Sequence, residues 1–384
     1  MTAPAPHPTV DVNLFVHNGA ATVSAAIESV LAQTWPALTL TLIDNGSTDA
    51  TPDILAEYAQ HDPRIRVMRN RVNAGPVLNC QRAFWLGDAD YVMPKTADDL
   101  LAPDFIARVM ATLLAHPECA MCHAAGLVFS GEGEVRGLYP PDHMVSATDP
   151  DPIRRATHVM TCYTSAPSFW GIYRRAAVNR LRRIAYRAGW DHAVVAELAL
   201  YGEIRSFAEP LFWRRDGGKG VGVLARGCSE FTQRGLSVED LFAEHGWRMP
   251  LISTAYGHIE VFALARLPTT DRLALMHAAI RIFRTRWLPL LQREAAAFHG
   301  MLPALLAALP AVDPIARAWS SRALGEAIAM IRTILPEQDF DADIEQLHHL
   351  AAFPASAGSV RLSHHSIPGL GGAVGGLDGL GLVG

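Results

Sequence analysis

The sequence contains almost no lysine and carries an excess of acidic side chains. Lys95 and Lys219 are the only lysines among 33 basic residues in this 384-residue chain, and 38 acidic residues leave a formal net charge of −5. General nucleic-acid binding needs a basic footprint, which this composition does not provide. We therefore expect no nucleic-acid partner.

Long apolar runs and cysteine-rich segments are also missing. No uninterrupted run of about 18 apolar residues occurs, so we expect no transmembrane helix. Residues 1–9 lack the basic start and apolar stretch of a signal peptide. Five cysteines in a chain of this length do not indicate a disulfide framework. The expected location is the cytoplasm.

The N-terminal half shows apolar strand-like segments that alternate with amphipathic helices. This spacing predicts an α/β domain whose sheet is mainly parallel, with helices on both faces. Further along, residues 172–181 are expected to form a helix, and beyond Gly217 only helices are expected. The predicted parts are a flexible N-terminus at 1–9, an α/β domain at 10–220, a helical region at 221–350 and a Gly-rich, disordered tail at 351–384.

Two adjacent carboxylates, Asp98 and Asp99, follow the short predicted strand Tyr91–Met93. Open α/β sheets bind ligands at the carboxyl ends of their strands. Carboxylates are also the ligands that Mg²⁺ uses when it is held together with phosphate oxygens. The alternative is that the two acids only cap the helix that begins near Pro103.

Other polar segments occupy equivalent positions. Val16-His-Asn-Gly19 follows the first predicted strand, and Asp44-Asn-Gly-Ser-Thr-Asp49 follows the second. Asp44 could serve only to close an Asx-turn. Trp190-Asp191-His192 opens a predicted helix, where Asp191 could act as an N-cap.

Together, Val16–Gly19, Asp44–Asp49 and Asp98-Asp99 resemble the family 2 glycosyltransferases. The segments Ile27–Thr34 (IESVLAQT) and Asp62–Val67 (DPRIRV) also match that family. The resemblance extends from about Val10 to Asp216 and is weaker beyond. It implies the GT-A fold, a Rossmann-like architecture, followed here by an all-helical region. It also implies inverting transfer of a hexose from a nucleoside-diphosphate sugar to a hydroxyl of a glycan, lipid-linked or protein acceptor, in polysaccharide biosynthesis.

The resemblance assigns a role to each matching position. In the family, the acid that ends the second strand reads the nucleotide base, and Asp44 holds that position. Asp98 is implied as the principal ligand of a divalent cation, Mg²⁺ or Mn²⁺, and Asp99 as a contact to the sugar or acceptor. The family's first metal-site acid is replaced by Thr96. The implied nucleotide-binding residues are Val16, Asn18, Asp44, Arg71, Asn79 and Asp98.

The same resemblance implies the catalytic base. A carboxylate about eleven residues before a helix-ending glycine takes this role in the family, and Asp191 precedes Gly202 at that spacing. One base is needed to take the acceptor proton during in-line attack. His192 is implied as a sugar or acceptor contact, or is a surface residue. Arg214 and Arg215 are implied to neutralise the diphosphate.

Two other interpretations remain open. The chain could be a non-catalytic GT-A relative that binds a nucleotide sugar or a protein partner. It could also work peripherally at the inner face of the membrane, because Arg281, Phe283, Arg284, Arg286 and Trp287 form a basic, aromatic helix end. Packing of this helix on the catalytic domain would explain these residues equally well. The oligomeric state is not predicted.

Overall fold

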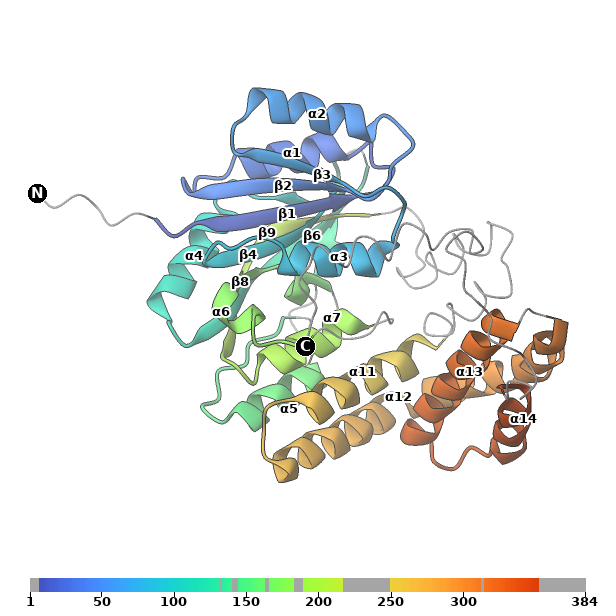
Figure 1. Cartoon of the computed structure of the whole chain (residues 1–384). Helices are drawn as coiled ribbons and strands as arrows, with labels where there is room; N and C mark the ends of the chain where they lie inside the picture. Colours follow the sequence, from blue (N-terminus) through green and yellow to red (C-terminus); the bar gives the residue numbers. More distant parts are fainter. Residues whose placement is uncertain are drawn as a thin grey trace, which may run out of the picture.

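A computed structural model describes residues 7–131, 133–139, 144–162, 166–182, 189–216, 249–311 and 314–351. The predicted disordered tail beyond 351 and a helix expected at 238–244 lie outside the described residues. Within the described part, an α/β domain is joined to a layer of long helices (Figure 1).

One mixed sheet organises the α/β domain. Its strand order is β3-β2-β1-β4-β8-β6-β9-β5, with β7 paired to β6. The first four strands of this order are mutually parallel, and β6 and β9 are also parallel, whereas β8 runs antiparallel to both of its neighbours. The strands are β1 Val10–Val16, β2 Leu38–Asp44, β3 Ile65–Arg69, β4 Tyr91–Thr96, β5 Leu100–Leu101, β6 Cys119–Phe129, β7 Val135–Leu138, β8 Ile172–Arg174 and β9 Glu203–Arg215.

The helix expected over residues 172–181 is wrong. Ile172–Arg174 forms β8, and only Arg175–Val178 is helical, as α6. Ile172 and Tyr173 are both fully buried, because β8 is inserted between β4 and β6 and covered on both faces. Burial on both sides removes the alternation that marks a strand, so the tertiary environment overrides the local pattern.

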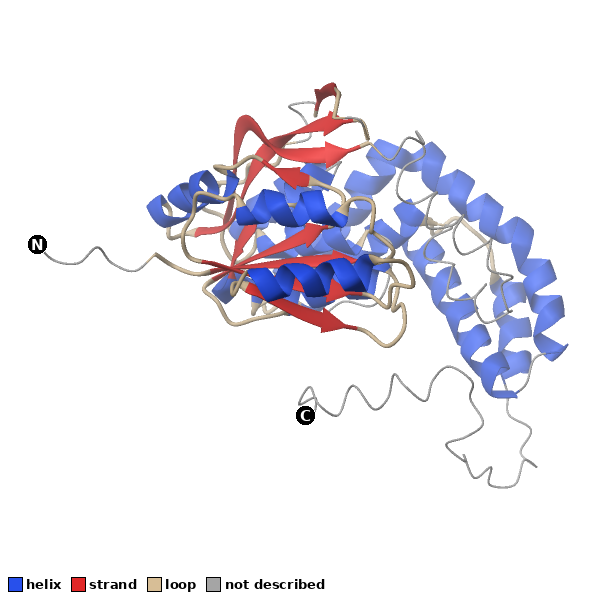
Figure 2. Ribbon diagram, turned by 90° about the horizontal axis from the view of Figure 1, so that it is seen from above, coloured by secondary structure: helices blue, strands red, loops and turns tan. Residues whose placement is uncertain are grey.

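Helices cover both faces of the sheet (Figures 1 and 2). Proline lies in the first turn of α2, α3 and α11, where its missing N–H costs nothing. The helices of the α/β domain are α1 Val23–Leu31, α2 Thr51–His61, α3 Pro76–Trp85, α4 Phe105–Ala115, α5 Pro152–Cys162, α6 Arg175–Val178 and α7 Trp190–Leu198. Those of the helical layer are α11 Pro250–Leu264, α12 Thr269–Ala308, α13 Pro314–Ile334 and α14 Asp341–Ala351.

Helix α12 is long and contains a break. Its backbone is non-helical at Trp287, two residues before Pro289. A proline inside a helix removes one hydrogen bond and clashes with the carbonyl four residues earlier, which kinks the chain. The break coincides with the boundary between the two helices that the sequence predicts at about 270–286 and 288–298.

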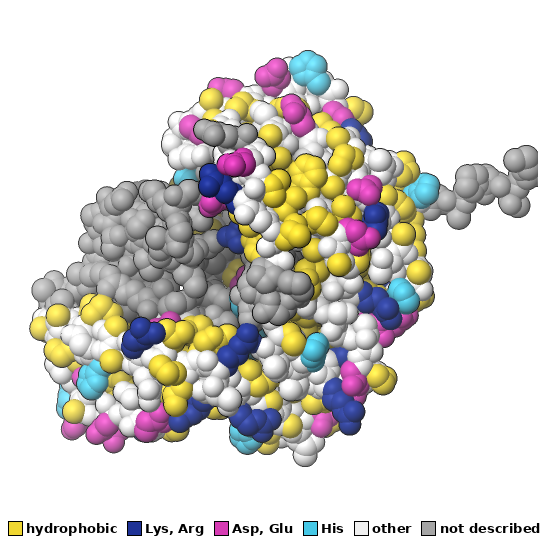
Figure 3. Space-filling model, turned by 180° about the vertical axis from the view of Figure 1, so that it is seen from behind, with side chains coloured by type: hydrophobic (Ala, Val, Ile, Leu, Met, Phe, Trp, Pro, Cys, Tyr) yellow, Lys and Arg dark blue, Asp and Glu magenta, His cyan; other side chains and the backbone are white. Residues whose placement is uncertain are grey.

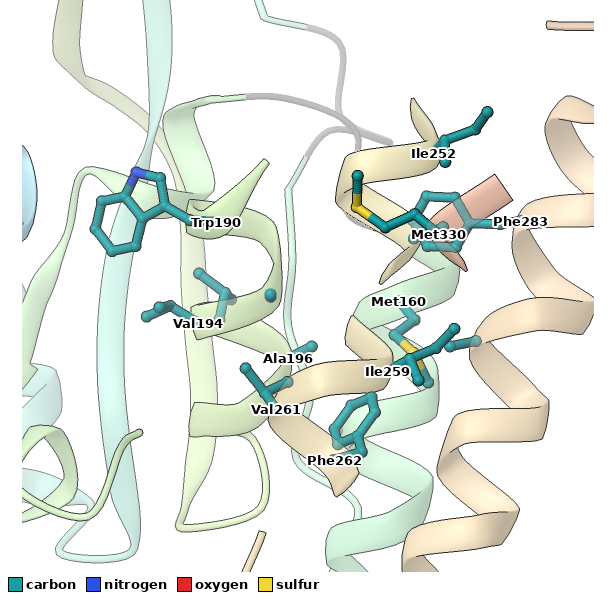
Figure 4. Close-up of a cluster of buried hydrophobic side chains, with 14 of the residues drawn as sticks. Met160, Trp190, Val194, Ala196, Ile252, Ile259, Val261, Phe262, Phe283 and Met330 are labelled. Atoms are coloured by element: carbon teal, nitrogen blue, oxygen red, sulfur yellow. The ribbon is translucent and has the colours of Figure 1, made fainter. Parts of the chain in front are cut away.

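The sheet separates two hydrophobic cores. One core joins α1, α2 and α4 to side chains such as Val12 and Leu14 on one face of β1. The other contains α3 and α7 and continues without interruption into α11, α12 and α13. Figure 4 shows this junction, where Ala196 of α7 lies near Val261 of α11. The helical layer is therefore packed directly onto the helix that carries Asp191.

Candidate functional site

The candidate site lies where β1, β2 and β4 end. In the parallel register Val16 is opposite Asp44, and Phe15 is opposite Thr96. Neighbouring parallel strands thus bring their carboxyl ends to one edge, the usual ligand position in an open α/β sheet. The structure therefore brings Val16, Asp44 and the start of the acidic loop together.

Asp44 is almost completely buried, with 1% of its surface exposed. Its Oδ1 accepts a hydrogen bond from the Ser47 amide at 2.8 Å, which forms the Asx-turn that the sequence left open. Its Oδ2 lies 3.0 Å from Nε of Arg69, an ion-pair distance. That contact does not have hydrogen-bond geometry, and within the described residues Oδ2 has no hydrogen-bond partner. A buried acceptor in this state is costly unless a ligand supplies a donor.

Arg69 was not predicted as a site residue. Its Nη2 also donates to the Ser47 carbonyl at 2.9 Å, so it braces the turn after β2. Asp44 and Arg69 are paired in the parallel register of β2 and β3, a relation that strand pairing alone could have revealed. The predicted Arg71 is exposed, two residues further along the chain.

Asn18 connects the loop after β1 to the loop after β2. It has a positive φ of 50°, which asparagine tolerates better than most residues. The backbone N–H of Asn18 donates to Oγ of Ser47 at 2.9 Å. The backbone N–H of Thr48 donates to Oδ1 of Asn18 at 2.8 Å. The predicted residue therefore fixes the shape of the site edge.

Asn45, at the position where the family that the sequence resembles has a second acid, organises the next loop. Its Nδ2 donates to Oδ1 of Asn73 at 2.7 Å. Its Oδ1 accepts from Nδ2 of Asn70 at 2.8 Å and from the Ala74 amide at 3.0 Å. An amide can donate and accept in this way, whereas a carboxylate can only accept. The substitution therefore carries a structural role that the sequence pattern did not indicate.

Asn79 lies in the first turns of α3 and is 2% exposed. Within the described part of the chain its Oδ1 has no hydrogen-bond partner. The helix begins after Gly75, whose φ of 82° lies in the left-handed region. Gly75 also accepts a hydrogen bond from Nδ2 of Asn45 at 3.3 Å, so α3 is tied to the turn after β2.

The two acids of the loop after β4 have different environments. Asp98 is exposed. Asp99 is 5% exposed, and its Oδ2 accepts from Oγ1 of Thr96 at 2.7 Å while its Oδ1 accepts from the Arg215 amide at 3.0 Å. Both oxygens of the Asp99 carboxylate thus accept hydrogen bonds from the protein itself. The predicted contact of Asp99 with the sugar or acceptor stays a prediction, and these hydrogen bonds do not favour it.

A buried lysine lies beneath this loop. Nζ of Lys95 donates to the carbonyl of Thr96 at 2.9 Å and to the carbonyl of Asp99. Burial lowers the pKa of Lys95 to about 8. Burial, followed by the charge of Asp98, raises the pKa of Asp99 to about 6, and the Lys95 charge opposes that rise.

Of the two arginines at the end of β9, Arg215 contacts the acidic loop. Its Nε donates to the Asp98 carbonyl at 3.1 Å, and its guanidinium lies 4.7 Å from the ring centroid of Phe129. Arg214 donates to the hydroxyl of Tyr139 at 2.5 Å. The structure therefore brings Arg215, Asp98 and Asp99 together.

Asp191 is half-buried in the first turn of α7, after Gly189, which has a φ of 75°. Burial raises the pKa of the Cys80 thiol on α3, and the charge of Asp191 adds to that rise. Burial lowers the pKa of the adjacent His192. Asp191 thus interacts with α3, and within the described residues no hydrogen bond or ion pair joins it to Asp98. Its N-cap alternative is not supported, because Gly189 holds the N-cap position.

The start of α7 is packed tightly against α11. A Cβ atom on Gly189 would lie 1.8 Å from Oγ1 of Thr254. Buried Trp190 fixes the other side, with its ring centroid 5.4 Å from that of Phe169. The position of Asp191 therefore depends on the helical layer, which the sequence did not reveal.

No helix among the described residues is long and apolar enough to cross a membrane. The helix end proposed for membrane contact is engaged within the protein. Arg284 donates to the Ile334 carbonyl and pairs with Glu337, each at 2.9 Å, and Phe283 is 2% exposed. On the face shown in Figure 3, basic side chains are interspersed with hydrophobic and acidic ones. Arg286 also donates to the carbonyl of Thr161 on α5, so part of this helix end packs on the α/β domain, whereas Arg281 is exposed.

Comparison with known proteins finds the same family that the sequence resembles. Residues 12–179 match the model of glycosyl transferase family 2. The uncharacterized glycosyltransferase YibD of Escherichia coli is 29% identical over 187 residues, which cover 46% of this chain and 51% of that protein. The putative glycosyltransferase EpsE of Bacillus subtilis is 31% identical over 131 residues, which cover 34% and 47%. The chain spans about half the length of these relatives.

Solved structures identify the fold. Staphylococcus aureus TarS 1–349 in complex with UDP superposes with a TM-score of 0.52 at 16% identity, covering 86% of this chain and 90% of that one. Its complex with UDP-GlcNAc gives 0.51 at 15% identity, covering 86% and 91%. Residues 12–179 are therefore similar to the family 2 glycosyltransferases, and the domain has the GT-A fold, as the sequence predicted.

Proposed function

We propose that this protein is an inverting glycosyltransferase that moves a sugar from a nucleoside-diphosphate sugar to an acceptor hydroxyl. The observation that carries the proposal is the buried Asp44 carboxylate at the end of β2, whose Oδ2 retains an unused acceptor site. It lies at the ligand-binding edge of a GT-A sheet, in a chain whose residues 12–179 match this family.

The nucleotide is assigned to the edge formed by Val16, Asn18 and Asp44. Oδ2 of Asp44 would accept an N–H of the base, beside the ion pair of Asp44 with Arg69. Asn79 adds a second buried oxygen without a partner among the described residues. The exposed Arg71 would contact the base or a phosphate. Because the TarS complexes contain UDP and UDP-GlcNAc, uridine donors are the first to test.

The diphosphate is assigned to the acidic loop. Among the described residues no group of three or more His, Cys, Asp or Glu could hold a metal ion by itself. Mg²⁺, however, is commonly held by one or two carboxylates together with substrate phosphates. The exposed carboxylate of Asp98 fits that role, and the bound cation would neutralise charge on the leaving diphosphate. Arg215, fixed to the same loop, and Arg214 would add positive charge there.

Asp191 is proposed as the general base. It would take the proton of the acceptor hydroxyl as that oxygen attacks the anomeric carbon and the diphosphate leaves from the opposite side. Its neighbour Gly189 and the α11 contact would fix its direction. His192 is assigned to the acceptor side. Relatives in polysaccharide assembly, such as the succinoglycan biosynthesis protein ExoO of Rhizobium meliloti, make a glycan or lipid-linked acceptor the first class to test.

One observation favours a non-catalytic nucleotide-sugar-binding relative as the second candidate. The first metal-site acid of the family is Thr96 here, and that hydroxyl is bonded to Asp99. In such a protein the donor would still bind at Asp44, but no transfer would occur. A cytoplasmic location is proposed for either candidate and is supported by Cys80, Cys119 and Cys122, which are buried free thiols.

The test is a screen of nucleotide sugars for thermal stabilisation, donor hydrolysis and transfer, with and without Mn²⁺. Asp191→Asn serves as the matched variant. We expect the variant to fold and bind donor normally, and to lose about 10²- to 10⁴-fold in transfer rate. Near-wild-type transfer by Asp191→Asn would remove Asp191 as the base. Donor binding without any transfer by the wild type would favour the non-catalytic candidate.

A further inference from the structure

A cavity of about 630 Å³ lies in the helical layer, between α13 and α14. Known ligand sites fall mostly between about 300 and 1,000 Å³, so its size suits a small organic molecule. It is formed by helices beyond the family match at 12–179. None of the residues assigned above to the nucleotide, diphosphate or acceptor lines it.

The cavity is open because of a glycine. Gly325 lies in the middle of α13, and a Cβ atom added there would meet no atom within 4 Å. Ile328, one turn further on, and Leu347 of α14 provide apolar walls and are 1% and 4% exposed. Ile344 extends the same wall along α14. The middle of the cavity therefore suits an apolar chain.

An arginine lies at each end of the cavity. Arg322 and Arg332 both line it and are ten residues apart, about 15 Å along α13. Arg332 is paired with Asp341 at 3.0 Å, which places the start of α14 at that end and neutralises the arginine. His348, two turns later in α14, must then lie towards Arg322. Among the described residues Arg322 is paired with Glu326 on its own helix, also at 3.0 Å, and 73% of its side chain is exposed.

A buried hydroxyl adds polar chemistry at the Arg322 end. Ser321 lines the cavity and is 4% exposed, and within the described residues its Oγ has no hydrogen-bond partner. Such a group is unfavourable in the folded protein unless something else bonds to it. A ligand oxygen next to Arg322 could fill this need.

We propose that this cavity binds an amphiphile with one anionic phosphate or carboxylate head on an apolar chain. The head lies at Ser321, Arg322 and His348, where the hydroxyl and the guanidinium donate to its oxygens. The chain lies over Gly325 between Ile328 and Leu347. The neutralised Arg332–Asp341 pair bounds the far end. The site is independent of the proposed glycosyl transfer.

The decisive experiment is calorimetric titration of the full chain with decyl phosphate held below its critical micelle concentration. Gly325→Leu fills the open space and improves the helix propensity, so it should fold normally. It is expected to weaken binding by more than about tenfold, because its side chain occupies the ligand volume. The matched control is Gly300→Leu, at another helical glycine with open space around it, which should bind as the wild type does.

Two further variants test the head group. Arg322→Gln should weaken binding by about tenfold. Ser321→Ala should weaken it by roughly three- to tenfold, yet leave the thermal midpoint of the ligand-free protein equal or higher, since it removes an unsatisfied hydroxyl. UDP binding should be the same in all variants, which separates this site from the nucleotide site.

The alternatives give distinct results. Equal affinity of Gly325→Leu and Gly300→Leu for decyl phosphate would overturn the proposal. So would wild-type affinity for uncharged decyl maltoside, or for inorganic phosphate, which has no chain, equal to that for decyl phosphate. Sedimentation with phosphatidylglycerol vesicles identifies the source of the amphiphile. Vesicle binding that Gly325→Leu abolishes points to a bilayer lipid, and binding of the monomer alone points to a soluble amphiphile.

Discussion

Replacement of Gly189 by alanine tests whether the helical layer sets the position of Asp191. Two costs are expected. The residue has a φ of 75°, and a non-glycine residue in the left-handed region costs about 1–2 kcal/mol. The new Cβ would lie 1.8 Å from Oγ1 and 2.6 Å from Cβ of Thr254, and such overpacking costs about 1–3 kcal/mol after relaxation. The free energy of unfolding should therefore fall by about 2–5 kcal/mol.

Urea unfolding measures this loss, and Gly300→Ala is the matched control. Gly300 lies inside α12, with no atom near its added Cβ, so alanine there should stabilise by about 0.5–1 kcal/mol. Thr254→Ala removes Oγ1 and Cγ2, which are two of the three clashing atoms. In that background, Gly189→Ala should lower the free energy of unfolding by a smaller amount. The two sites should therefore show a coupling energy in a double-mutant cycle.

The same variant should affect transfer more than donor binding. Moving α7 displaces Asp191 and leaves Asp44 in place, so kcat should fall while the affinity for UDP changes little. A change in unfolding free energy within about 0.5 kcal/mol of zero would refute the packing argument. Equal loss of UDP affinity and kcat would refute the assignment of separate roles to α7 and to the end of β2.

Three further predictions rest on single contacts. Burial raises the pKa of Glu294 to about 7 from 4.5, so stability should fall as pH rises from about 4.5 to 7, and thermal melts of Glu294→Gln should lose that part of the slope. Asp44→Ala should weaken UDP binding by about tenfold or more, and calorimetry showing unchanged affinity would contradict the nucleotide assignment. Asn45→Asp should lower stability by about 1–3 kcal/mol, because a carboxylate cannot donate to Asn73; a midpoint equal to wild type would show that the loop does not depend on this bond.

Much of the site edge could be predicted from the sequence. Strand–helix alternation indicates parallel strands, and parallel strands place their carboxyl ends side by side, so Val16 and Asp44 had to be neighbours. The role of Arg69 could not be predicted, because Arg71 is also an arginine near the end of β3 and the sequence does not distinguish the two positions. Only the register of β2 and β3 distinguishes the two arginines.

Contacts between distant segments could not be predicted. Asp99 accepts a hydrogen bond from the backbone N–H of Arg215, 116 residues away. Neither the local sequence pattern nor the spacing of motifs predicts that hydrogen bond. The contact between Gly189 and Thr254 crosses from the GT-A domain to the helical layer. The apolar face of a helix shows that it has a partner, but it does not identify that partner.

The contrast between Asp98 and Asp99 is the prediction that most directly tests the acidic loop. Asp98 is exposed, so Asp98→Asn should leave the thermal midpoint unchanged. It should weaken UDP binding in the presence of Mn²⁺ and have little effect when EDTA is present, because it removes a proposed metal ligand.

Asp99→Asn should behave in the opposite way. Burial raises the pKa of Asp99 to about 6 from 3.8, so the folded state disfavours the ionised carboxylate. Wild-type stability should therefore fall as pH rises from about 4 to 6, while the neutral amide, which can accept from Arg215 and donate to Thr96, should remove that slope. At pH 7.5 Asp99→Asn should be at least as stable as the wild type and should bind UDP normally. If Asp99→Asn instead abolishes transfer without changing stability, and Asp98→Asn has no effect with Mn²⁺, then Asp99 contacts the substrate and the loop opens when the donor binds. If both variants melt like the wild type at every pH, the buried network of Lys95, Thr96 and Asp99 does not stabilise the loop.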